Sequence, residues 1–249
     1  MSVDIKVLGG STENEVTNRN KLIEKLKSTP IPDNELVHNL GLYLNRQTLC
    51  RILFFHEIYK KIINVHGVVM EFGVRWGQNL SLFSSFRGIY EPYNYLRQII
   101  GFDTFSGFPN VNQLDGKNVS KGDYGVSDNY EEYLNEILLY HQNESPISHK
   151  KKYDLIKGDA NKTVPKYLAD HPETIIALAY FDFDIYEPTK NVLNAILPHL
   201  TKGSVLGFDE LCMKEFPGET LAFKEVLGLS KYSIKRLPYS PTTSYIIID

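Results

Sequence analysis

From residue 66 to residue 249 the chain alternates short, almost wholly apolar runs with longer segments whose apolar residues recur at helical spacing. Such apolar runs, bounded by turn residues, are typical of strands buried on both faces of a parallel sheet. Helical segments separate the first five runs, whereas only Pro238–Thr243 separates the last two. The pattern predicts an α/β fold with a doubly wound, mostly parallel, seven-stranded Rossmann-like sheet and a C-terminal antiparallel hairpin. The predicted strands are 67–72, 98–103, 153–157, 174–181, 203–208, 231–237 and 244–248.

The first 65 residues do not follow this alternation. Residues 1–34 form a polar leader with loop-like glycine and proline clusters and one short helical segment. Residues 48–63 carry apolar side chains at helical spacing, and this helix is predicted to pack on the sheet ahead of the first strand. We therefore divide the chain into an N-terminal helical extension, 1–65, and an α/β domain, 66–249. The extension could form a homodimer interface or a lid, and the sequence leaves both alternatives open.

One connection within the α/β domain is too long for a simple crossover. A helix is predicted at Asp128–Gln142, with Asp128 as its cap. This leaves 107–126 as a polar loop of about 20 residues, and loops of that length in a compact domain are usually functional lids or disordered segments. Because the loop leaves the sheet at its carboxyl end, we predict a lid-like insertion, with disorder as the alternative.

Acidic residues follow two of the predicted strands at the point where each strand ends. Asp182 and Asp184 follow the fourth strand, and Asp209 and Glu210 follow the fifth. Open α/β sheets bind their ligands beyond the carboxyl ends of the strands. Four carboxylates so close together would repel each other unless a cation or a shared proton intervened. This cluster is therefore the predicted chemical centre.

A glycine turn follows the first strand and points to a cofactor. Gly73 and Gly77 lie four residues apart, which differs from the G-x-G-x-x-G pattern of pyrophosphate sites, and Glu71 suits an amine-bearing ligand better than a phosphate. Asp103 ends the second strand, where doubly wound folds place an acid on ribose hydroxyls. Together these residues indicate a nucleoside cofactor without a pyrophosphate, and S-adenosylmethionine fits. The alternative for the glycines is a strand-to-helix turn that requires positive φ.

Composition and charge exclude several other classes of protein. Of the 249 residues, 27 are Lys or Arg and 30 are Asp or Glu, so the net charge of −3 gives no support to nucleic-acid binding. No apolar run approaches the roughly 20 residues that span a bilayer, which argues against a membrane partner. No secretory segment is recognisable, and Cys50 and Cys212 are too few for a disulfide framework. We expect a cytoplasmic protein that acts on a small molecule.

Four segments resemble the macrocin O-methyltransferase family, whose members are class I S-adenosylmethionine-dependent enzymes. The family methylates hydroxyls, often on sugars of natural products. The resemblance covers about residues 65–215, and the motifs occur in the family's order. The matching segments are Glu71–Gly77, Phe102–Pro109, Asp182–Thr189 and Gly207–Leu211.

The resemblance implies a role for each acid. Family members bind a divalent metal, usually Mg²⁺, through acids that correspond to Asp184, Asp209 and Glu210. The acid corresponding to Asp182 is the proposed general base. By the general pattern of class I methyltransferases, Asp159 is a candidate for the adenine amine, although it could instead cap the helix that follows.

Three departures from the family's pattern affect these assignments. Glu210 stands where the family usually has Asp, Phe183 replaces a usual Gly, and Val74-Arg-Trp-Gly77 replaces the common Val-Trp-Arg-Gly-Gly. The predicted function is nevertheless metal-assisted O-methylation, by S-adenosylmethionine, of a hydroxylated sugar or other small natural product. The alternatives are a same-fold relative with another activity, such as the cephalosporin hydroxylase-like proteins, and a cofactor-binding protein without catalysis. A nicotinamide dehydrogenase is disfavoured because G-x-G-x-x-G is missing.

Overall fold

The computed structural model describes residues 11–249, so the first ten residues of the polar leader lie outside the described part. Its centre is a seven-stranded sheet in the order β3-β2-β1-β4-β5-β7-β6. Strands β1 to β5 are parallel, and β7 runs antiparallel to both β5 and β6. The predicted doubly wound sheet with a C-terminal antiparallel hairpin is therefore confirmed. The strands are β1 Val68–Phe72, β2 Ile99–Asp103, β3 Tyr153–Lys157, β4 Ile176–Phe181, β5 Leu200–Phe208, β6 Lys235–Arg236 and β7 Ser244–Ile247.

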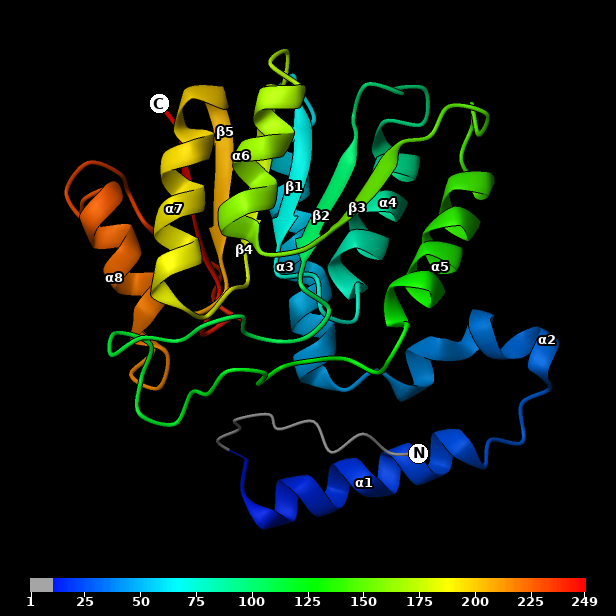
Figure 1. Ribbon diagram of the computed structural model, residues 1–249. Coiled ribbons are helices and arrows are strands. Elements are labelled where there is room, and N and C mark those ends of the chain that lie inside the picture. Colours follow the sequence, from blue (N-terminus) through cyan, green and yellow to red (C-terminus); the bar gives the residue numbers. More distant parts are fainter. Residues whose placement is uncertain (1–10) are drawn as a thin grey trace.

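Helices cover both faces of this sheet (Figure 1). Helices α3, α4 and α5 pack on one face, and α6, α7 and α8 pack on the other. No helix within residues 11–249 combines the length and the apolar character that crossing a bilayer requires. The helices are α1 Glu13–Lys27, α2 Asp33–Leu36, α3 Arg46–Ile62, α4 Gln78–Tyr90, α5 Tyr130–Glu144, α6 Ala160–Asp170, α7 Tyr186–Ile196 and α8 Pro217–Val226, with 3-10 turns η1 Val37–Tyr43 and η2 Leu197–His199.

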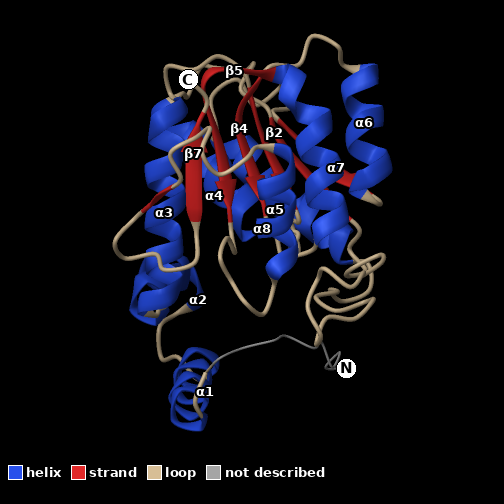
Figure 2. Ribbon diagram, turned by 90° about the vertical axis from the view of Figure 1, so that its left-hand side faces the viewer, coloured by secondary structure: helices blue, strands red, loops and turns tan. Residues whose placement is uncertain are grey.

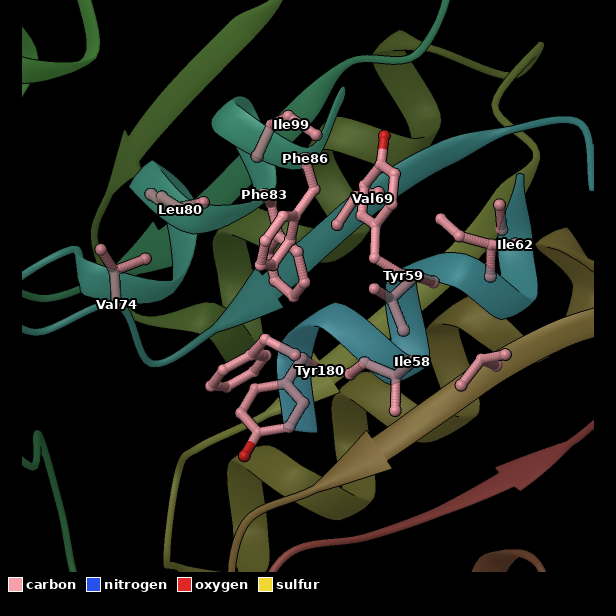
Figure 3. Close-up of a cluster of buried hydrophobic side chains, with 14 of the residues drawn as sticks. Ile58, Tyr59, Ile62, Val69, Val74, Leu80, Phe83, Phe86, Ile99 and Tyr180 are labelled. Carbon is pink, nitrogen blue, oxygen red and sulfur yellow. The ribbon is translucent and has the colours of Figure 1, made fainter. Parts of the chain in front are cut away.

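Helix α3 is part of the core, as its apolar spacing predicted. Its side chains Ile58, Tyr59 and Ile62 lie against β1, β4 and α4 (Figure 3) and are fully buried. Burial of each large apolar side chain stabilises the fold by about 1.5–3 kcal/mol. The helix begins two residues earlier than the predicted Thr48, because the Asn45 side chain accepts a hydrogen bond from the Thr48 amide at 2.8 Å and caps it.

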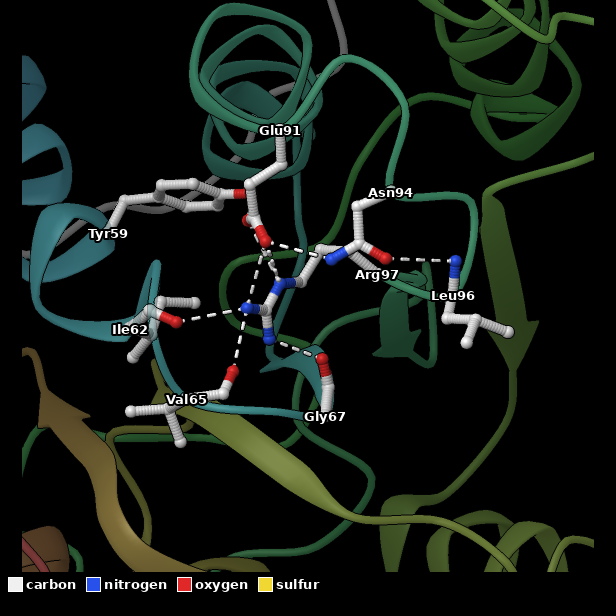
Figure 4. Close-up of polar contacts among 8 residues, drawn as sticks. All are labelled: Tyr59, Ile62, Val65, Gly67, Glu91, Asn94, Leu96 and Arg97. Atoms are coloured by element: carbon white, nitrogen blue, oxygen red, sulfur yellow. Dashed lines mark hydrogen bonds and ion pairs between the residues drawn. The ribbon is translucent and has the colours of Figure 1, made fainter.

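A buried arginine fixes the path from α3 into the sheet (Figure 4). The Arg97 guanidinium is 1% exposed and donates to the Glu91 carboxylate, with Nε–Oε2 at 3.0 Å. It also donates to the backbone carbonyls of Ile62, Val65 and Gly67. A buried charge is tolerated only when it is paired and hydrogen-bonded. Arg97 therefore ties the end of α3 and the start of β1 to the connection between α4 and β2.

The segment before α3, residues 11–45, is here called the N-terminal arm. No side chain of its elements α1, α2 and η1 is buried. Helix α1 lies beyond the carboxyl ends of the strands and apart from the sheet (Figures 1 and 2). The extension thus consists of two parts, the exposed arm and the core helix α3. Large apolar side chains exposed on the arm are Val16, Ile23, Val37, Leu40, Leu42 and Leu44.

The long loop 107–126 contains no helix or strand and lies over the carboxyl end of the sheet. Phe108 and Val119 pack with Ile185 and Phe216 in a small apolar cluster of their own. The Asp115 carboxylate accepts from the Tyr186 amide at 2.6 Å and thereby joins the loop to the start of α7. These contacts hold the loop over the site, while its mobility stays a prediction.

The prediction that Asp128 caps the helix after this loop is wrong. Helix α5 is preceded by Asn129, which has a left-handed φ of 58° and makes no side-chain capping hydrogen bond. The loop therefore enters α5 through a backbone turn.

Candidate functional site

A cavity of about 380 Å³ opens at the carboxyl ends of the strands. Its walls come from the ends of β1 to β5, from the starts of α4 and α6, from α3 and from loop 107–126. Eight of the nine predicted site residues line it, and the exception is Glu71. The eight are Gly73, Gly77, Asp103, Asp159, Asp182, Asp184, Asp209 and Glu210.

Both glycines of the turn after β1 are required by the backbone itself. Gly73 has φ +92°, and a Cβ there would lie 2.0 Å from the carbonyl oxygen of Asp182. Gly77 has φ +76°, and a Cβ there would lie 2.2 Å from Cδ1 of Leu134. Residues with a Cβ rarely adopt this φ region. At Gly73 a Cβ would also collide with backbone, whereas at Gly77 it would meet the end of a leucine side chain. The backbone turn is thus present, and cofactor contact by the two glycines, which also line the cavity, stays a prediction.

Asp103 shapes the same turn from the end of β2. Its Oδ2 accepts from the amides of Val74 and Arg75 at 2.7 and 2.8 Å, and its Oδ1 accepts from the amide of Phe105 at 2.5 Å. An ionised carboxylate has about four acceptor positions. The chain's own amides use three of them, so a ribose hydroxyl would have to bind at the remaining position.

Asp159 has the capping role that was the alternative to adenine binding. It precedes α6, and its Oδ1 accepts from the amide of Asn161 at 3.0 Å. Because Asp159 also lines the cavity, the adenine contact stays a prediction beside the observed cap.

Glu71 lies behind the cavity wall rather than in it. Its side chain is fully buried, and Oε1 accepts from Nδ2 of Asn79 at 2.6 Å, while Oε2 has no partner. Burial, and secondarily the nearby Asp182, raises the pKa of Glu71 well above its ordinary value. Asn79, the second residue of α4, lines the cavity. Any influence of Glu71 on a ligand would therefore pass through Asn79.

The four predicted carboxylates at the ends of β4 and β5 surround one side of the cavity. Burial raises the pKa of Asp182 to about 7, with the Asp209 carboxylate adding to the shift. Burial raises the pKa of Glu210 to about 8, again with Asp209 as the next cause. The pKa of Asp184 is raised well above its ordinary value by burial and then by Glu210. The expected mutual repulsion of these acids is thus present in the fold.

A fifth acid, Glu219 on α8, joins this cluster and was missed by the sequence analysis. It is fully buried, and its Oε1 accepts from the amide of Glu210 at 3.2 Å. Burial, followed by the Asp209 charge, raises its pKa well above the ordinary value. No signal in the sequence identified Glu219, because an acid in the first turn of a helix usually interacts with the helix dipole at the surface.

An arginine from the extension pairs with two of the acids, and it too was missed. Arg51 donates through Nη1 to Oδ1 of Asp209 at 2.5 Å and through Nη2 to Oδ2 of Asp182 at 2.6 Å. The Tyr180 hydroxyl donates to the same Oδ1 of Asp209. Arg51 precedes Asp182 by 131 residues, so only the packing of α3 on the sheet brings the two together.

The oxygen donors of the cluster are of the type that a divalent metal ion prefers. Their present arrangement, however, is not that of a metal-binding site. Mg²⁺ prefers oxygen ligands, and all five acids supply them. One carboxylate oxygen on Glu210 and one on Glu219 are buried without a partner, as expected where a cation or proton is needed. Within residues 11–249, however, no three His, Cys, Asp or Glu side chains converge as a metal-ligand set. A metal ion bound by Asp209 would share this carboxylate with Arg51, which already pairs with Oδ1.

Comparison with known proteins identifies the family to which the chain belongs. No protein-family model matches the sequence, and no curated protein does. Among solved structures, that of CalS11, a calicheamicin methyltransferase, is 44% identical with a TM-score of 0.93 and covers 99% of this chain and 98% of its own.

Two further structures agree. An apo structure of CalS11, described as a TDP-rhamnose 3'-O-methyltransferase, is 42% identical with a TM-score of 0.86 over 96% of both chains. The O-methyltransferase NovP shares the fold at 18% identity and a TM-score of 0.61, over 94% of this chain and 98% of its own. Because the identity to CalS11 extends over nearly the whole of both chains, this protein belongs to the family of S-adenosylmethionine-dependent O-methyltransferases that includes CalS11.

Proposed function

We propose that this enzyme methylates a hydroxyl of a sugar or of another small natural product, with a divalent metal ion in the site, as the resemblance to the macrocin O-methyltransferase family implies. The observation that carries the proposal is the gathering of Asp182, Asp184, Asp209 and Glu210 around one cavity at the carboxyl edge of the sheet. Four carboxylates this close together, all at least partly buried, favour a site that handles a proton and a cation.

A sugar acceptor is supported by a relative and by the cavity. CalS11 is described as acting on TDP-rhamnose. The cavity wall also carries Arg75, Trp76 and Tyr124, with the Arg75 guanidinium 5.0 Å from the centre of the Tyr124 ring. Aromatic faces and a guanidinium suit a sugar ring and a phosphate group. We therefore place a nucleotide-linked sugar first among the acceptors to be tested.

The chain's residues would divide the chemistry between them. S-adenosylmethionine supplies the methyl group, and the turn after β1, with Asp103, would hold its nucleoside part. A neutral hydroxyl is a poor nucleophile, so a base must take its proton as the methyl group is transferred. Asp182 is our candidate, because a carboxylate with a pKa of about 7 can accept a proton near neutral pH. Mg²⁺ held by Asp184, Asp209 and Glu210 would lower the pKa of the acceptor hydroxyl.

The decisive experiment is methyl transfer from labelled S-adenosylmethionine to TDP-rhamnose and other hydroxylated acceptors, with Mg²⁺ or with excess chelator. We expect turnover with Mg²⁺ and its loss in chelator and in Asp184→Ala. Full activity in chelator would refute the metal role. Binding of S-adenosylhomocysteine without turnover on any acceptor would favour the alternative of a cofactor-binding protein.

A base variant tests the role of Asp182. We expect Asp182→Asn to keep cofactor affinity and to lose rate by about 10²–10⁴-fold, the usual effect of removing a positioned base. Single-turnover kinetics with a productive acceptor would measure the chemical step. Asp170→Asn is the matched control, because Asp170 ends α6 and is an exposed partner of Lys166. An unchanged rate in Asp182→Asn would exclude this residue as the base.

A further inference from the structure

We propose that Arg51 is an internal cation of the site that competes with the divalent metal ion: its guanidinium pairs Asp182 with Asp209 in the metal-free enzyme and gives up Asp209 when metal binds. The inference rests on the metal site of the proposed function. It assigns to α3, a helix outside the four segments that resemble the macrocin O-methyltransferase family, a direct influence on metal affinity.

The geometry shows a bridge between two strand ends. Asp182 follows β4 and Asp209 follows β5, and one guanidinium donates to both, at 2.6 and 2.5 Å. The Arg51 side chain is 28% exposed, and its guanidinium carbon lies 5.1 Å from the centre of the Phe55 ring one turn further along α3. The planar fork of an arginine suits such a double contact, and the aromatic ring beneath it holds its orientation.

The contact between Arg51 and the two aspartates matters because the cluster holds many more acids than cations. Five acids lie in the cluster, and Arg51 is the cation that pairs directly with them among the described residues. Its contacts reach Asp182 and Asp209, whereas Glu210 and Glu219 each keep one buried oxygen without a partner. The metal-free cluster is therefore only partly neutralised, and a second cation would be favoured there.

Asp209 would have to serve both cations if metal bound while the Arg51 contact stayed in place. Oδ1 of Asp209 already accepts from Arg51 and from the Tyr180 hydroxyl. A divalent metal ion at either oxygen of Asp209 would place two cations at one carboxylate, where they repel each other. Arg51 lines the open cavity, so its long side chain has room to leave Asp209. Asp182 can remain its partner, which would make Arg51 a positioning residue for the candidate base.

The test is metal affinity measured without turnover. Mn²⁺, used as a reporter for Mg²⁺, is titrated into the full-length, metal-stripped protein by calorimetry and electron paramagnetic resonance. We expect Arg51→Met and Arg51→Gln to bind Mn²⁺ more tightly than the wild type by about tenfold, within the usual range of coupling between sites. Arg46→Met is the matched control, because Arg46 is exposed in the first turn of the same helix, and its affinity should equal that of the wild type.

Thermal unfolding supplies an independent readout. Without metal, both Arg51 variants should melt below the wild type, because two partly buried carboxylates lose their partner. Mn²⁺ should raise their melting temperatures more than that of the wild type, since a ligand that binds the folded state stabilises it in proportion to its affinity. Arg51→Gln keeps a hydrogen-bond donor and serves if Arg51→Met fails to fold.

The possible results distinguish a failure of the proposed competition from a failure of the proposed metal site. If the wild type and the Arg51 variants bind Mn²⁺ equally, or the variants bind more weakly, the competition is refuted and the metal site stands. If neither the wild type nor any Arg51 variant binds Mn²⁺, both proposals fail. If the Arg51 variants bind Mn²⁺ and the wild type does not, the competition is supported, with the guanidinium of Arg51 excluding the metal from the wild-type site.

Discussion

At the scale of single residues, the site is governed by acids whose roles depend on what the chain itself offers them. Asp103 accepts from three backbone amides and Asp159 from one, so both stabilise local structure before any ligand arrives. Glu210 and Glu219 are in the opposite situation, because each has a buried oxygen without a partner. Substitution of Asp103 or Asp159 should therefore affect both the fold and cofactor binding. Substitution of Glu210 or Glu219 should change how the protein responds to pH and to metal.

Replacement of Asp103 should weaken cofactor binding and also destabilise the turn after β1. In Asp103→Ala the amides of Val74, Arg75 and Phe105 lose their acceptor, and each buried donor left without one costs about 1–3 kcal/mol where water cannot replace it. We expect a lower melting temperature and a weaker calorimetric affinity for S-adenosylhomocysteine. Asp154→Ala, at a half-exposed position on β3, is the control. Unchanged affinity in Asp103→Ala would remove the ribose assignment.

Glu210 should make the metal-free enzyme less stable as pH rises. Its pKa is about 8 in the folded protein against an ordinary value of 4.5, so between these values the folded state holds a proton that the unfolded state has released. Stability therefore falls as pH rises from about 4.5 to about 8, by on the order of 2–4 kcal/mol for this group.

Urea unfolding across this pH range, in chelator, measures the effect. Glu210→Gln should flatten the decline, because the amide does not titrate, and saturating Mg²⁺ should reduce it in the wild type. A slope identical in the wild type and in Glu210→Gln would show that this carboxyl does not carry the pH dependence.

At the scale of elements, the site is built where strand ends, α3 and a long loop meet. Loop 107–126 contributes Gly107, Phe108, Pro109 and Tyr124 to the cavity wall. Its apolar cluster is small, with Phe108 and Val119 as its buried members from the loop. Segments with few buried apolar contacts open at low free energy.

We accordingly expect the loop to behave as a lid. Hydrogen exchange should be faster in 107–126 than in the core strands β1 and β4, and S-adenosylhomocysteine should slow it. Peptides from α5, which packs on the sheet beyond the loop, serve as the internal reference. Protection of the loop equal to that of the core strands, unchanged by cofactor, would contradict the lid.

At the scale of the whole molecule, the N-terminal arm is the part that the α/β domain does not stabilise. Helix α1 has 15 residues and none is buried, whereas isolated helices of that length are only marginally stable in water. Acidic Glu13 and Glu15 lie in its first turn, and basic Lys25 and Lys27 lie in its last. Two copies of α1 packed antiparallel would bring opposite charges together and cover Val16 and Ile23. We therefore expect the arm to pair with the arm of a second copy.

Two deletions test the arm and the division of the chain. Without residues 1–44 the protein should fold, with α3 intact, and light scattering should give the mass of a monomer where the full chain gives a dimer. Without residues 1–65 it should fail to fold, because the buried side chains of α3 are lost from the core. A monomeric full-length chain would refute the pairing, and a folded 66–249 fragment would show that the α/β domain is independent of α3.

The sequence by itself determined the sheet, its direction and the positions of the acids at its edge, because buried strands and strand-end carboxylates are local patterns. It also indicated α3 through helical spacing, and the family through four short segments. Only the tertiary structure decided that Glu71 lies behind the cavity, that Asn129 rather than Asp128 precedes α5, and that Glu219 and Arg51 join the acids. These depend on how helices distant in the chain pack on the sheet, and a charged residue on a helix gives no local sign of whether it faces water or a buried site.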